Sequence, residues 1–552
     1  MRRRLLTRRD FIRRGASAAA LAFVPSASGL TAGLVPSGVN LVPDRPGKTP
    51  SYWCTWGIQN YSLEVPDELT HATVANNLTE KLMFQDPGWA TKYFPKVRGD
   101  LYILYDLGWD VPPSLQFDKE RWRLGSLEVS TAKFPSCSGT PAQRLRKLNE
   151  MTKAAGWRGA AIWIPAQAPG DGKDGRLMGP KELEQFFRER ARWSREAGIE
   201  YWKIDYGARD GDADFRKMIT TVAQEGSPGL RVEHARCCGP VSDEEVPWEN
   251  LVASKKGSYR TWDNGKILQQ ALKLLEFSDV LRTYDVTAYF SVPTTLDRVA
   301  QILAGVSKST RKSALLNCED EPYIGAVLGC AMGILRHPLW RDYPNKPYDP
   351  YSVKRRIDAV TRAVRWQRLA PAFGVGMAKV TLDDNFQLDH WVFKENETWA
   401  QWLVGREVVQ GAPARVARGM ALPMVLGKGL RPYVVASQNP NGAIAVATLP
   451  RISKEKGFYL PLVDVGIEIG EGNSPVGVFG RYRSLTLRLA GNLGRRRAWA
   501  QDLAGDRATD ITDRVRVNGA TVTLEGDVID SIGLSAATPG DVSDPGLVLQ
   551  FI

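Results

Sequence analysis

The chain has 552 residues, 43% of them hydrophobic and 24% charged, which is enough apolar material to bury a core in each of two or three domains. Its formal net charge is +12, and residues 1–28 contribute +6 of this through seven arginines and one aspartate. The rest of the chain gathers no basic cluster and, after residue 30, contains no apolar run long enough for a bilayer. This pattern predicts neither a nucleic-acid partner nor a membrane anchor.

The first segment is typical of an export signal. Thr7–Ile12 has the twin-arginine pattern, Gly15–Val24 is a small apolar stretch, and Ser26–Gly29 is rich in small residues. This order of basic, apolar and small residues predicts export of the folded protein by the twin-arginine pathway, to the periplasm or the cell exterior. We therefore expect residues 1–50 to be a signal peptide and linker.

Cysteine and histidine are sparse, and their spacing matches no metal-binding motif. No CxxC or HExxH occurs, and no GxGxxG follows a strand-like run, so we expect no metal and no cofactor. We expect most cysteines to be buried, although export to an oxidising compartment would permit a disulfide. The cysteines are Cys54, Cys137, Cys237, Cys238, Cys318 and Cys330, and the histidines are His71, His234, His337 and His390.

Short apolar runs alternate with helical patterns from residue 51 onward. Strands that alternate with helices indicate βαβ units, and this repeat predicts a (β/α)8 TIM barrel over residues 51–372. The expected strands are Tyr52–Ile58, Leu101–Leu107, Gly159–Pro165, Glu200–Tyr206, Leu230–Ala235, Val280–Val286, Ala314–Cys318 and Gly333–Arg336. The expected helices are Thr140–Ala155, Pro180–Gly198, Ala213–Gly226, Thr294–Leu303 and Asp349–Leu369.

After Gly374 the pattern changes to short alternating runs that turn residues separate. Asn441-Gly442 lies between two such runs and indicates a hairpin. We therefore predict an α/β barrel followed by an all-β sandwich over residues 373–552. The expected strands of this second domain are Trp391–Lys394, Thr398–Val404, Tyr433–Ser437, Ala443–Leu449, Leu485–Leu489, Thr521–Leu524 and Leu547–Phe551.

The fourth expected strand carries the most informative chemistry. Side chains alternate along a strand, so Tyr201, Lys203 and Asp205 should share one face. A cation beside a carboxylate keeps the carboxylate ionised, as a nucleophile requires, and functional residues of barrels lie at the C-terminal ends of strands. Asp205 is therefore a candidate nucleophile, with a purely structural ion pair as the alternative.

General acid–base catalysis needs a second carboxylate, and two candidate aspartates lie at the ends of the sixth expected strand. Asp285 ends this strand with Arg282 close by, whereas Asp279 precedes it. A neighbouring carboxylate such as Asp205 would raise the pKa of Asp285 and suit it to the role of general acid. The alternative is that Asp285 only caps the following turn.

Five short motifs follow one another at the ends of the expected strands. They are Trp53-Cys54-Thr55-Trp56, Asp106-Leu107-Gly108-Trp109, Ala161-Ile162-Trp163, Lys203-Ile204-Asp205 and Arg282-Thr283-Tyr284-Asp285. In this order they resemble the α-galactosidase clan of retaining glycoside hydrolases, families twenty-seven and thirty-six. The resemblance spans the chain from about Ser51 to its end in architecture, including the β-domain.

The resemblance implies an exported retaining exo-α-glycosidase that acts on oligo- or polysaccharide ends. It implies that Asp205 is the nucleophile and Asp285 the acid/base, with Asp279 as a competitor because the spacing after Arg282 is short. The carboxyl groups of such a pair lie about 5–5.5 Å apart. We expect substrate contacts from residues at the strand ends, the tryptophans as stacking faces or else as core. These residues are Trp56, Asp106, Trp109, Trp163, Lys203, Glu233 and Arg282.

One departure from the clan pattern affects the expected specificity. Leu107 stands where the clan usually has a second aspartate that reads sugar hydroxyls, so we expect a glycone other than galactose. The acidic run Glu319-Asp320-Glu321 precedes Pro322 and should cap the next helix, although Glu319 or Asp320 could bind sugar hydroxyls. Non-catalytic carbohydrate binding on a degenerate barrel is the alternative function, and an exported redox enzyme is a third.

Overall fold

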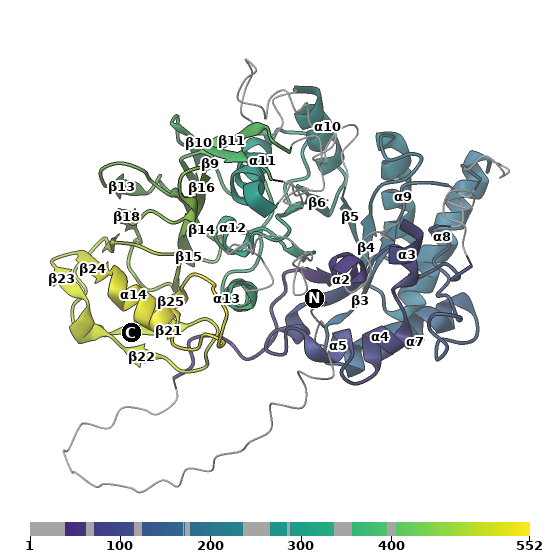
Figure 1. The fold of residues 1–552 in the computed structure, drawn as a ribbon, viewed down its shortest axis with the longest axis horizontal. Helices are drawn as coiled ribbons and strands as arrows, with labels where there is room; N and C mark the ends of the chain where they lie inside the picture. Colours follow the sequence, from purple (N-terminus) through teal and green to yellow (C-terminus); the bar gives the residue numbers. More distant parts are fainter. Residues whose placement is uncertain are drawn as a thin grey trace, which may run out of the picture. The chain divides into compact units, whose positions relative to one another are not determined.

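The structure is a computed structural model, and it describes residues 39–61, 71–114, 124–168, 170–171, 177–235, 265–283, 288–335, 356–394 and 404–552 (Figure 1). Asn40–Ile552 form one compact unit. The expected twin-arginine signal, with residues 1–38, lies outside the described residues. None of the helices in the described ranges combines the length and apolar composition needed to cross a bilayer.

Eight parallel strands form one sheet in the order β7-β6-β5-β4-β3-β2-β1-β8. A parallel bridge between Asn317 and Ala331 joins β7 to the start of β8, so the sheet closes into the predicted barrel. The strands are β1 Tyr52–Cys54, β2 Tyr102–Tyr105, β3 Gly159–Ile164, β4 Tyr201–Ile204, β5 Arg231–His234, β6 Val280–Arg282, β7 Leu315–Asn317 and β8 Gly333–Ile334.

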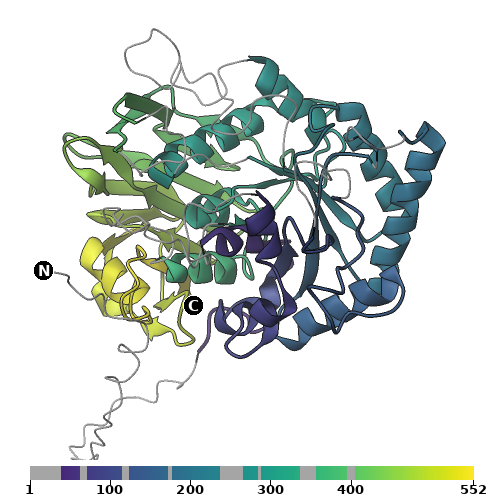
Figure 2. The ribbon, with the colours of Figure 1, turned by 45° about the vertical axis from the view of Figure 1, so that its right-hand side comes forward.

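Helices form a layer around these strands, as the blue and teal ribbons of Figure 2 show. All five expected helices are present, although residues 349–355 of the last one lie outside the described residues. The helices before the β-domain are α2 Thr55–Tyr61, α3 His71–Asn76, α4 Glu80–Phe84, α5 Trp89–Lys92, α7 Pro141–Ala154, α8 Pro180–Ala197, α9 Ala213–Gly226, α10 Gly265–Leu275, α11 Ser291–Gly305, α12 Pro322–Leu328 and α13 Ile357–Trp366.

Local sequence signals explain where several of these helices begin and end. Thr140 and Gln143 form a reciprocal capping box at the start of α7, and Gly198 ends α8 in the left-handed conformation at φ +68°. The first strand is shorter than expected because helix α2 begins at Thr55. The Thr55 hydroxyl donates to Gln59 Oε1 at 2.7 Å, one helical turn later, which favours the helix over a longer strand.

The barrel interior shows the expected alternation of side chains. Tyr201 packs into the apolar cluster inside the strands, whereas Trp202 points outward and donates to Ser194 of α8 at 3.0 Å. Lys203 aligns with Glu233 of the next strand and with Trp163 of the preceding one. Because these three positions share one register level, their side chains form a layer inside the barrel.

After the barrel, an eight-stranded and a five-stranded sheet face each other around one apolar cluster, as expected for a sandwich. The sheets have the orders β22-β21-β25-β19-β15-β14-β12-β9 and β13-β18-β20-β24-β23. Their strands are β9 Val380–Leu382, β12 Arg415–Arg418, β13 Met424–Leu426, β14 Tyr433–Gln438, β15 Ile444–Leu449, β18 Asp464–Glu468, β19 Val476–Phe479, β20 Ser484–Arg488, β21 Ala498–Asp502, β22 Thr509–Asp510, β23 Arg516–Asn518, β24 Thr521–Glu525 and β25 Gly546–Phe551.

The expected hairpin is present, because β14 and β15 pair antiparallel and Gly442 takes φ +93° in the turn. Two hairpins and one helix lie outside the two large sheets. They are β10 Phe386–Val392 with β11 Glu407–Pro413, β16 Arg451–Ser453 with β17 Gly457–Tyr459, and α14 Gly526–Gly533. Most of the expected strand Thr398–Val404 lies outside the described residues.

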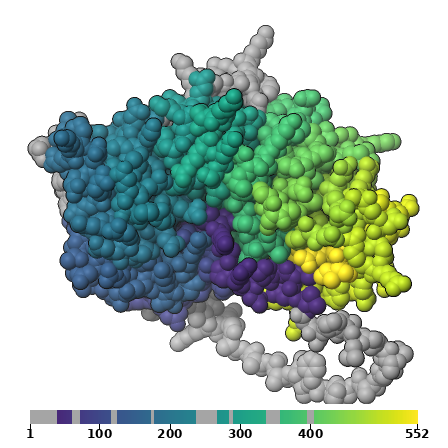
Figure 3. All heavy atoms as spheres, turned by 180° about the vertical axis from the view of Figure 1, so that it is seen from behind, coloured from purple at the N-terminus to yellow at the C-terminus, as the bar shows by residue number. Residues whose placement is uncertain are grey.

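Buried polar contacts join the barrel to the β-domain. Arg362 of α13 donates to both oxygens of Asp502 at 2.9 and 3.1 Å. The segment from residue 40 also touches both parts, since the Leu41 amide donates to Gln501 Oε1 at 2.7 Å and the Gly47 amide donates to Asp100. Figure 3 shows this purple segment beside the yellow β-domain. Part of the expected linker is therefore packed against the folded unit.

Candidate active site

Asp205 directly follows β4, so the backbone places it at the C-terminal end of the barrel strands. Its amide donates to the carbonyl of Ile164 at 2.9 Å, and its own carbonyl accepts from Arg216 of α9 at 2.6 Å. The Asp205 side chain is nearly buried, with 4% of the residue exposed. These two backbone bonds on either side of the strand end fix the direction in which the carboxylate points.

Three donors hold the Asp205 carboxylate. Lys203 Nζ lies 2.8 Å from Oδ2, the indole of Trp163 donates to Oδ2 at 3.0 Å, and the Tyr206 amide donates to Oδ1 at 2.9 Å. Burial by itself would raise the pKa of Asp205. The cations Lys203 and Arg282, with the hydrogen bonds from Lys203 and Trp163, outweigh burial and hold the pKa well below its ordinary value. Asp205 is therefore an ionised carboxylate at neutral pH.

Lys203 also binds Asp106, which follows β2, with Nζ 3.1 Å from Oδ2. Asp106 accepts further hydrogen bonds from the Cys54 thiol at 3.0 Å and from the Leu107 amide at 2.8 Å. Burial and the Arg282 cation lower the pKa of Lys203, but the Asp106 and Asp205 carboxylates outweigh them, so its pKa is raised. The lysine is thus a charged bridge between two carboxylates from different strands.

A second polar network lies deeper in the barrel around Glu233. The glutamate is fully buried and accepts hydrogen bonds from Tyr52, Tyr201 and Asn317, each at 2.7 Å. Asn317 also donates to the Tyr52 hydroxyl at 3.1 Å. The sequence motifs indicated Glu233 but not these three partners. The signal was available, because each has a hydrogen-bonding side chain at an inward position of its strand.

Arg282 ends β6 and forms a buried ion pair with Glu319, in which Arg282 Nε donates to Glu319 Oε1. Glu319 follows β7 and takes φ +50°, a left-handed conformation that is uncommon for residues other than glycine. Its amide donates to Asn317 Oδ1 at 2.9 Å. Asn317 therefore links this ion pair to the deeper network around Glu233.

The expected capping role of the acidic run is wrong. Helix α12 has Glu321 at its N-cap position, and no side chain makes a capping hydrogen bond there. Glu321 instead accepts a hydrogen bond from Ser291, and Glu319 binds Arg282. The sequence favoured capping because Pro322 starts the helix, but buried cations and hydroxyls of neighbouring elements compete for these carboxylates more effectively than the helix terminus.

The two candidates for the acid/base have different positions. Asp285 lies outside the described residues. Asp279 precedes β6, where it accepts hydrogen bonds from Gln224 at 2.7 Å and the Val232 amide at 2.9 Å and pairs with Arg311 at 2.8 Å. This is the N-terminal end of the strand, so the structure does not bring Asp279 to Asp205.

The three candidate tryptophans differ in their surroundings. Trp163 is 1% exposed and orients Asp205 through its indole N–H. Trp109 is fully buried and donates to the carbonyl of Trp163 at 3.0 Å, a position that favours the core alternative over a stacking face. Trp56 of α2 is half-buried and packs against the apolar cluster inside the barrel.

Cysteine, histidine and acidic side chains elsewhere in the described ranges form no metal-binding cluster. No group of three or more His, Cys, Asp or Glu side chains there could hold a metal ion. Cys54, Cys137, Cys318 and Cys330 are buried free thiols, and Cys237 and Cys238 lie outside the described residues. His234 is buried between Arg216 and Thr220, and burial followed by the Arg216 cation lowers the pKa of its imidazole.

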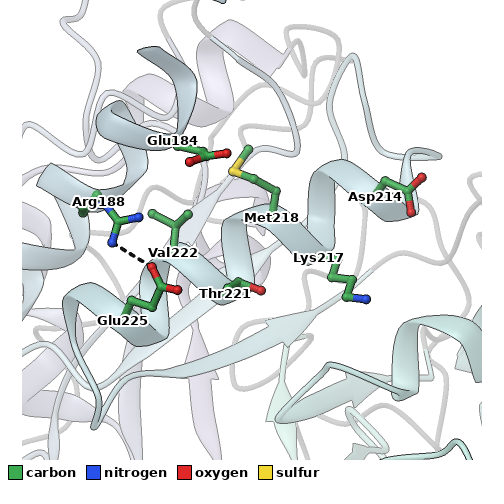
Figure 4. Close-up of a pocket in the computed structure, with 8 residues that line it drawn as sticks. All are labelled: Glu184, Arg188, Asp214, Lys217, Met218, Thr221, Val222 and Glu225. Atoms are coloured by element: carbon green, nitrogen blue, oxygen red, sulfur yellow. Dashed lines mark hydrogen bonds and ion pairs between the residues drawn. The ribbon is translucent and has the colours of Figure 1, made fainter. Parts of the chain in front are cut away.

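One groove of about 360 Å³ lies between the outer helices α8 and α9 (Figure 4). Glu184, Lys217 and Met218 line it, together with Arg188 and Glu225, which form an ion pair of 2.8 Å. None of the candidate site residues belongs to this groove. The ionised Asp205 carboxylate and the bridging Lys203 therefore lie apart from this groove, at the strand ends of the barrel.

Comparison with known proteins found similarity only among solved structures. No model of a known protein family matches the chain, and no curated protein matches it. A family 27 β-L-arabinopyranosidase from Geobacillus stearothermophilus is 10% identical, with 91% of this chain and 96% of that chain covered, at a TM-score of 0.40. A candidate α-galactosidase from Bacteroides fragilis is 12% identical, with 92% and 80% covered, at 0.39.

A candidate α-N-acetylgalactosaminidase from Bacillus halodurans is also similar. It is 10% identical, with 86% of this chain and 97% of that chain covered, at a TM-score of 0.37. The first is described as an arabinopyranosidase and the other two as candidate glycosidases. Identities of 10–12% and TM-scores of 0.40 or less assign neither a family nor an activity to this chain.

Proposed function

We propose that the protein is a retaining glycoside hydrolase in which Asp205 is the nucleophile. The observation that carries this proposal is an ionised carboxylate at the C-terminal end of β4, oriented by Lys203, Trp163 and the Tyr206 amide. A nucleophile must be ionised and held in one direction before the substrate arrives. The resemblance of the strand-end motifs to the α-galactosidase clan supports the same assignment.

The proposed reaction has two displacements. Asp205 attacks the anomeric carbon and forms a glycosyl ester while Asp285 protonates the leaving oxygen. Asp285 then takes a proton from water, and this water hydrolyses the ester so that the configuration of the sugar is retained. Lys203 stays protonated throughout and keeps Asp205 ionised, because the neighbouring carboxylates raise its pKa. The role of Asp285 rests on the sequence motif alone.

The substrate and location belong to the same proposal. The clan resemblance supports an exo-α-glycosidase that removes terminal sugars from oligo- or polysaccharides, and Leu107 supports a glycone other than galactose. The twin-arginine pattern in Thr7–Ile12 supports export to the periplasm or the cell exterior. A panel of aryl glycosides, tested on periplasmic and secreted fractions as well as on pure protein, would identify the glycone and the location together.

The substitution Asp205→Ala tests the nucleophile. We expect it to reduce hydrolysis of the best aryl glycoside by about 10⁴-fold or more, because no covalent intermediate can form. Added azide should restore turnover and yield the glycosyl azide of inverted configuration, since azide enters from the face that Asp205 occupied. Product configuration is measured by NMR.

The matched control is Asp279→Ala, which removes a carboxylate at the opposite end of the barrel strands. We expect this variant to keep most of the wild-type rate. Near wild-type turnover by Asp205→Ala, or an azide product of retained configuration, would show that Asp205 is not the nucleophile.

One observation favours non-catalytic carbohydrate binding as a second candidate function. Leu107 is 1% exposed and packs in the apolar cluster of the barrel with Ala75 and Cys54, so this position supplies no second carboxylate for sugar hydroxyls. A site with fewer polar contacts would bind sugar without cleaving it efficiently. Hydrolysis of any aryl α-glycoside by pure wild-type protein, lost in Asp205→Ala, excludes this candidate.

A further inference from the structure

Arg216 holds the backbone on both sides of the point where β4 ends. It belongs to α9, the helix that follows β4 on the outside of the barrel, and its side chain is fully buried. Its guanidinium donates to the carbonyls of Ile204 at 3.1 Å, Asp205 at 2.6 Å and Asp210 at 2.8 Å. Asp210 lies in the turn between β4 and α9. This arginine therefore fixes the end of the strand and the turn that leaves it together.

The peptide unit between Asp205 and Tyr206 connects this arginine to the carboxylate. Its carbonyl accepts from Arg216, and its N–H donates to Asp205 Oδ1 at 2.9 Å. The unit is a planar trans peptide, so its carbonyl and its N–H point in opposite directions. Because Arg216 holds the carbonyl toward the outer helices, the N–H is turned toward the carboxylate. Arg216 thus acts, through the backbone, on the direction in which the Asp205 carboxylate is held.

Two residues hold Arg216 in turn. The Arg216 guanidinium lies 3.2 Å from Nδ1 of His234, and Nε2 of the same ring lies 2.8 Å from the Thr220 hydroxyl. A guanidinium can only donate, so Nδ1 is the acceptor and the ring proton is on Nε2, directed at Thr220. The Thr220 hydroxyl then donates to the Arg216 carbonyl at 2.8 Å. The three residues form a closed cycle in which each donates to the next.

This cycle requires a neutral imidazole. His234 ends β5 and points to the outer helices, because Glu233 before it points into the barrel. Burial, followed by the Arg216 cation, lowers the pKa of His234 well below its ordinary value. A protonated ring would offer Arg216 no acceptor and would place a second cation beside it. The imidazole is therefore neutral near pH 7, and the cycle is complete.

We propose that Arg216 is a positioning residue for Asp205, and that His234 and Thr220 fix the guanidinium of Arg216. This inference rests on the proposed glycosidase function, because it assigns the held carboxylate to nucleophilic attack. Misplacing a reacting group by about 1 Å costs about 10²-fold in rate. Residues behind a reacting side chain supply this precision when their own positions are locked by packing and hydrogen bonds.

The substitution Arg216→Lys tests the positioning role. An ammonium is a point donor and does not reproduce the planar fork that reaches three carbonyls. We expect kcat for the best aryl glycoside to fall about 10²-fold, with KM within about threefold of the wild type, because Arg216 lies outside the barrel. The control Arg418→Lys changes another buried arginine that donates to carbonyls, those of Leu328 and Gly374. It should lower stability but leave kcat within about threefold of the wild type.

Substitutions of Thr220 give a milder test, which decides the matter if Arg216→Lys does not fold. Thr220→Val removes the hydroxyl that accepts from His234, whereas Thr220→Ser keeps it. We expect kcat to fall about tenfold in Thr220→Val and to stay within about twofold of the wild type in Thr220→Ser. Equal kcat values in the two variants would overturn the proposal.

Amide exchange tests the proposal without turnover. We expect the Tyr206 amide to exchange about tenfold faster in Arg216→Lys than in the wild type or in Arg418→Lys. Mass spectrometry with electron-transfer fragmentation measures this exchange. Folded Arg216→Lys with a wild-type kcat, or with unchanged Tyr206 exchange, would overturn the proposal. Wild-type protein that cleaves no aryl glycoside, together with faster Tyr206 exchange in Arg216→Lys, would refute the glycosidase function and leave the hold of Arg216 on Asp205 in place.

Discussion

At the scale of single residues, Lys203 is the side chain on which the candidate site depends. It is 2% exposed and is the shared cation of two carboxylates from different strands. Without it, Asp106 and Asp205 would be two neighbouring buried negative charges with no ammonium between them. A buried charge that loses its partner is costly, so this lysine matters for both stability and reactivity.

Lys203→Met should lower the free energy of unfolding by about 3 to 5 kcal/mol at neutral pH, because it leaves buried carboxylates uncompensated. The effect should depend on pH. In the wild type the lowered pKa of Asp205 stabilises the fold above the ordinary aspartate pKa of about 4, and this contribution is lost as the pH falls below that value. In the variant burial raises the pKa of Asp205, so the deficit should shrink as the pH falls from 7 toward 4.

Urea unfolding followed by circular dichroism between pH 4.5 and 8 measures this difference. The exposed lysine Lys217 of α9 allows the same change as a control, and Lys217→Met should alter stability by less than about 0.5 kcal/mol at every pH. A deficit for Lys203→Met that stays constant across this range would contradict the shared-cation interpretation.

At the scale of elements, the barrel depends on side chains that satisfy the ends of helices and strands. Asn149 of α7 is 3% exposed and donates to the carbonyls of Ala197 and Gly198, each at 2.9 Å, where α8 ends. Its Oδ1 accepts from the Ala160 amide at 2.9 Å, close to the start of β3. One amide therefore joins α7, the end of α8 and β3, and it fixes the turn that leads into the strand of Asp205.

Asn149→Ala should lower the free energy of unfolding by about 2 to 4 kcal/mol, because it leaves three backbone groups without this partner in a buried environment. Denaturant unfolding checks the value. Asn518→Ala, at an exposed position of β23, is the control and should change stability by less than about 0.5 kcal/mol. Equal losses of stability in the two variants would mean that Asn149 does not hold α7, the end of α8 and the start of β3 together.

At the scale of the whole molecule, buried ion pairs connect the barrel to the β-domain. Arg362 of α13 and Asp502 of β21 are both almost fully buried, and their guanidinium–carboxylate contact is bidentate. Asp502 also accepts from the amides of Ala504 and Ala536. Arg418 of β12 adds donors to the carbonyls of Leu328 and Gly374. These contacts explain why the chain from Asn40 onward behaves as one compact unit.

Arg362→Met should destabilise the protein by about 3 to 5 kcal/mol, because it leaves the buried Asp502 carboxyl group without its guanidinium partner. Calorimetry and urea unfolding check this. The exposed pair Arg483–Asp464 gives the control, and Arg483→Met should cost less than about 1 kcal/mol. A loss of less than about 1 kcal/mol for Arg362→Met would show that the barrel and the β-domain do not depend on the Arg362–Asp502 pair.

The sequence predicted the fold and the pairing of Lys203 with Asp205 because both depend on local patterns. Eight apolar runs with intervening helices predicted the barrel, and alternation along Glu200–Gly207 placed Lys203 and Asp205 on one face. Prediction was weaker at element ends, as at Thr55, where helix α2 begins and the Thr55 hydroxyl accepts a hydrogen bond from the Asp106 amide after β2 at 2.9 Å. Local propensity does not decide such ends, because tertiary contacts of similar energy compete with it.

By itself, the sequence determined the order of the barrel strands and the face that Lys203 and Asp205 share, since a period of two and the order of strands are properties of the chain. Only the tertiary structure decided how the buried charges pair. In the structure Lys203 contacts two carboxylates, and Glu233 accepts hydrogen bonds from three donors. Arg282 pairs with Glu319, which the sequence had suggested as a helix cap. The physical reason is that electrostatic pairing depends on distances of a few ångströms between strands far apart in sequence, which no local pattern encodes.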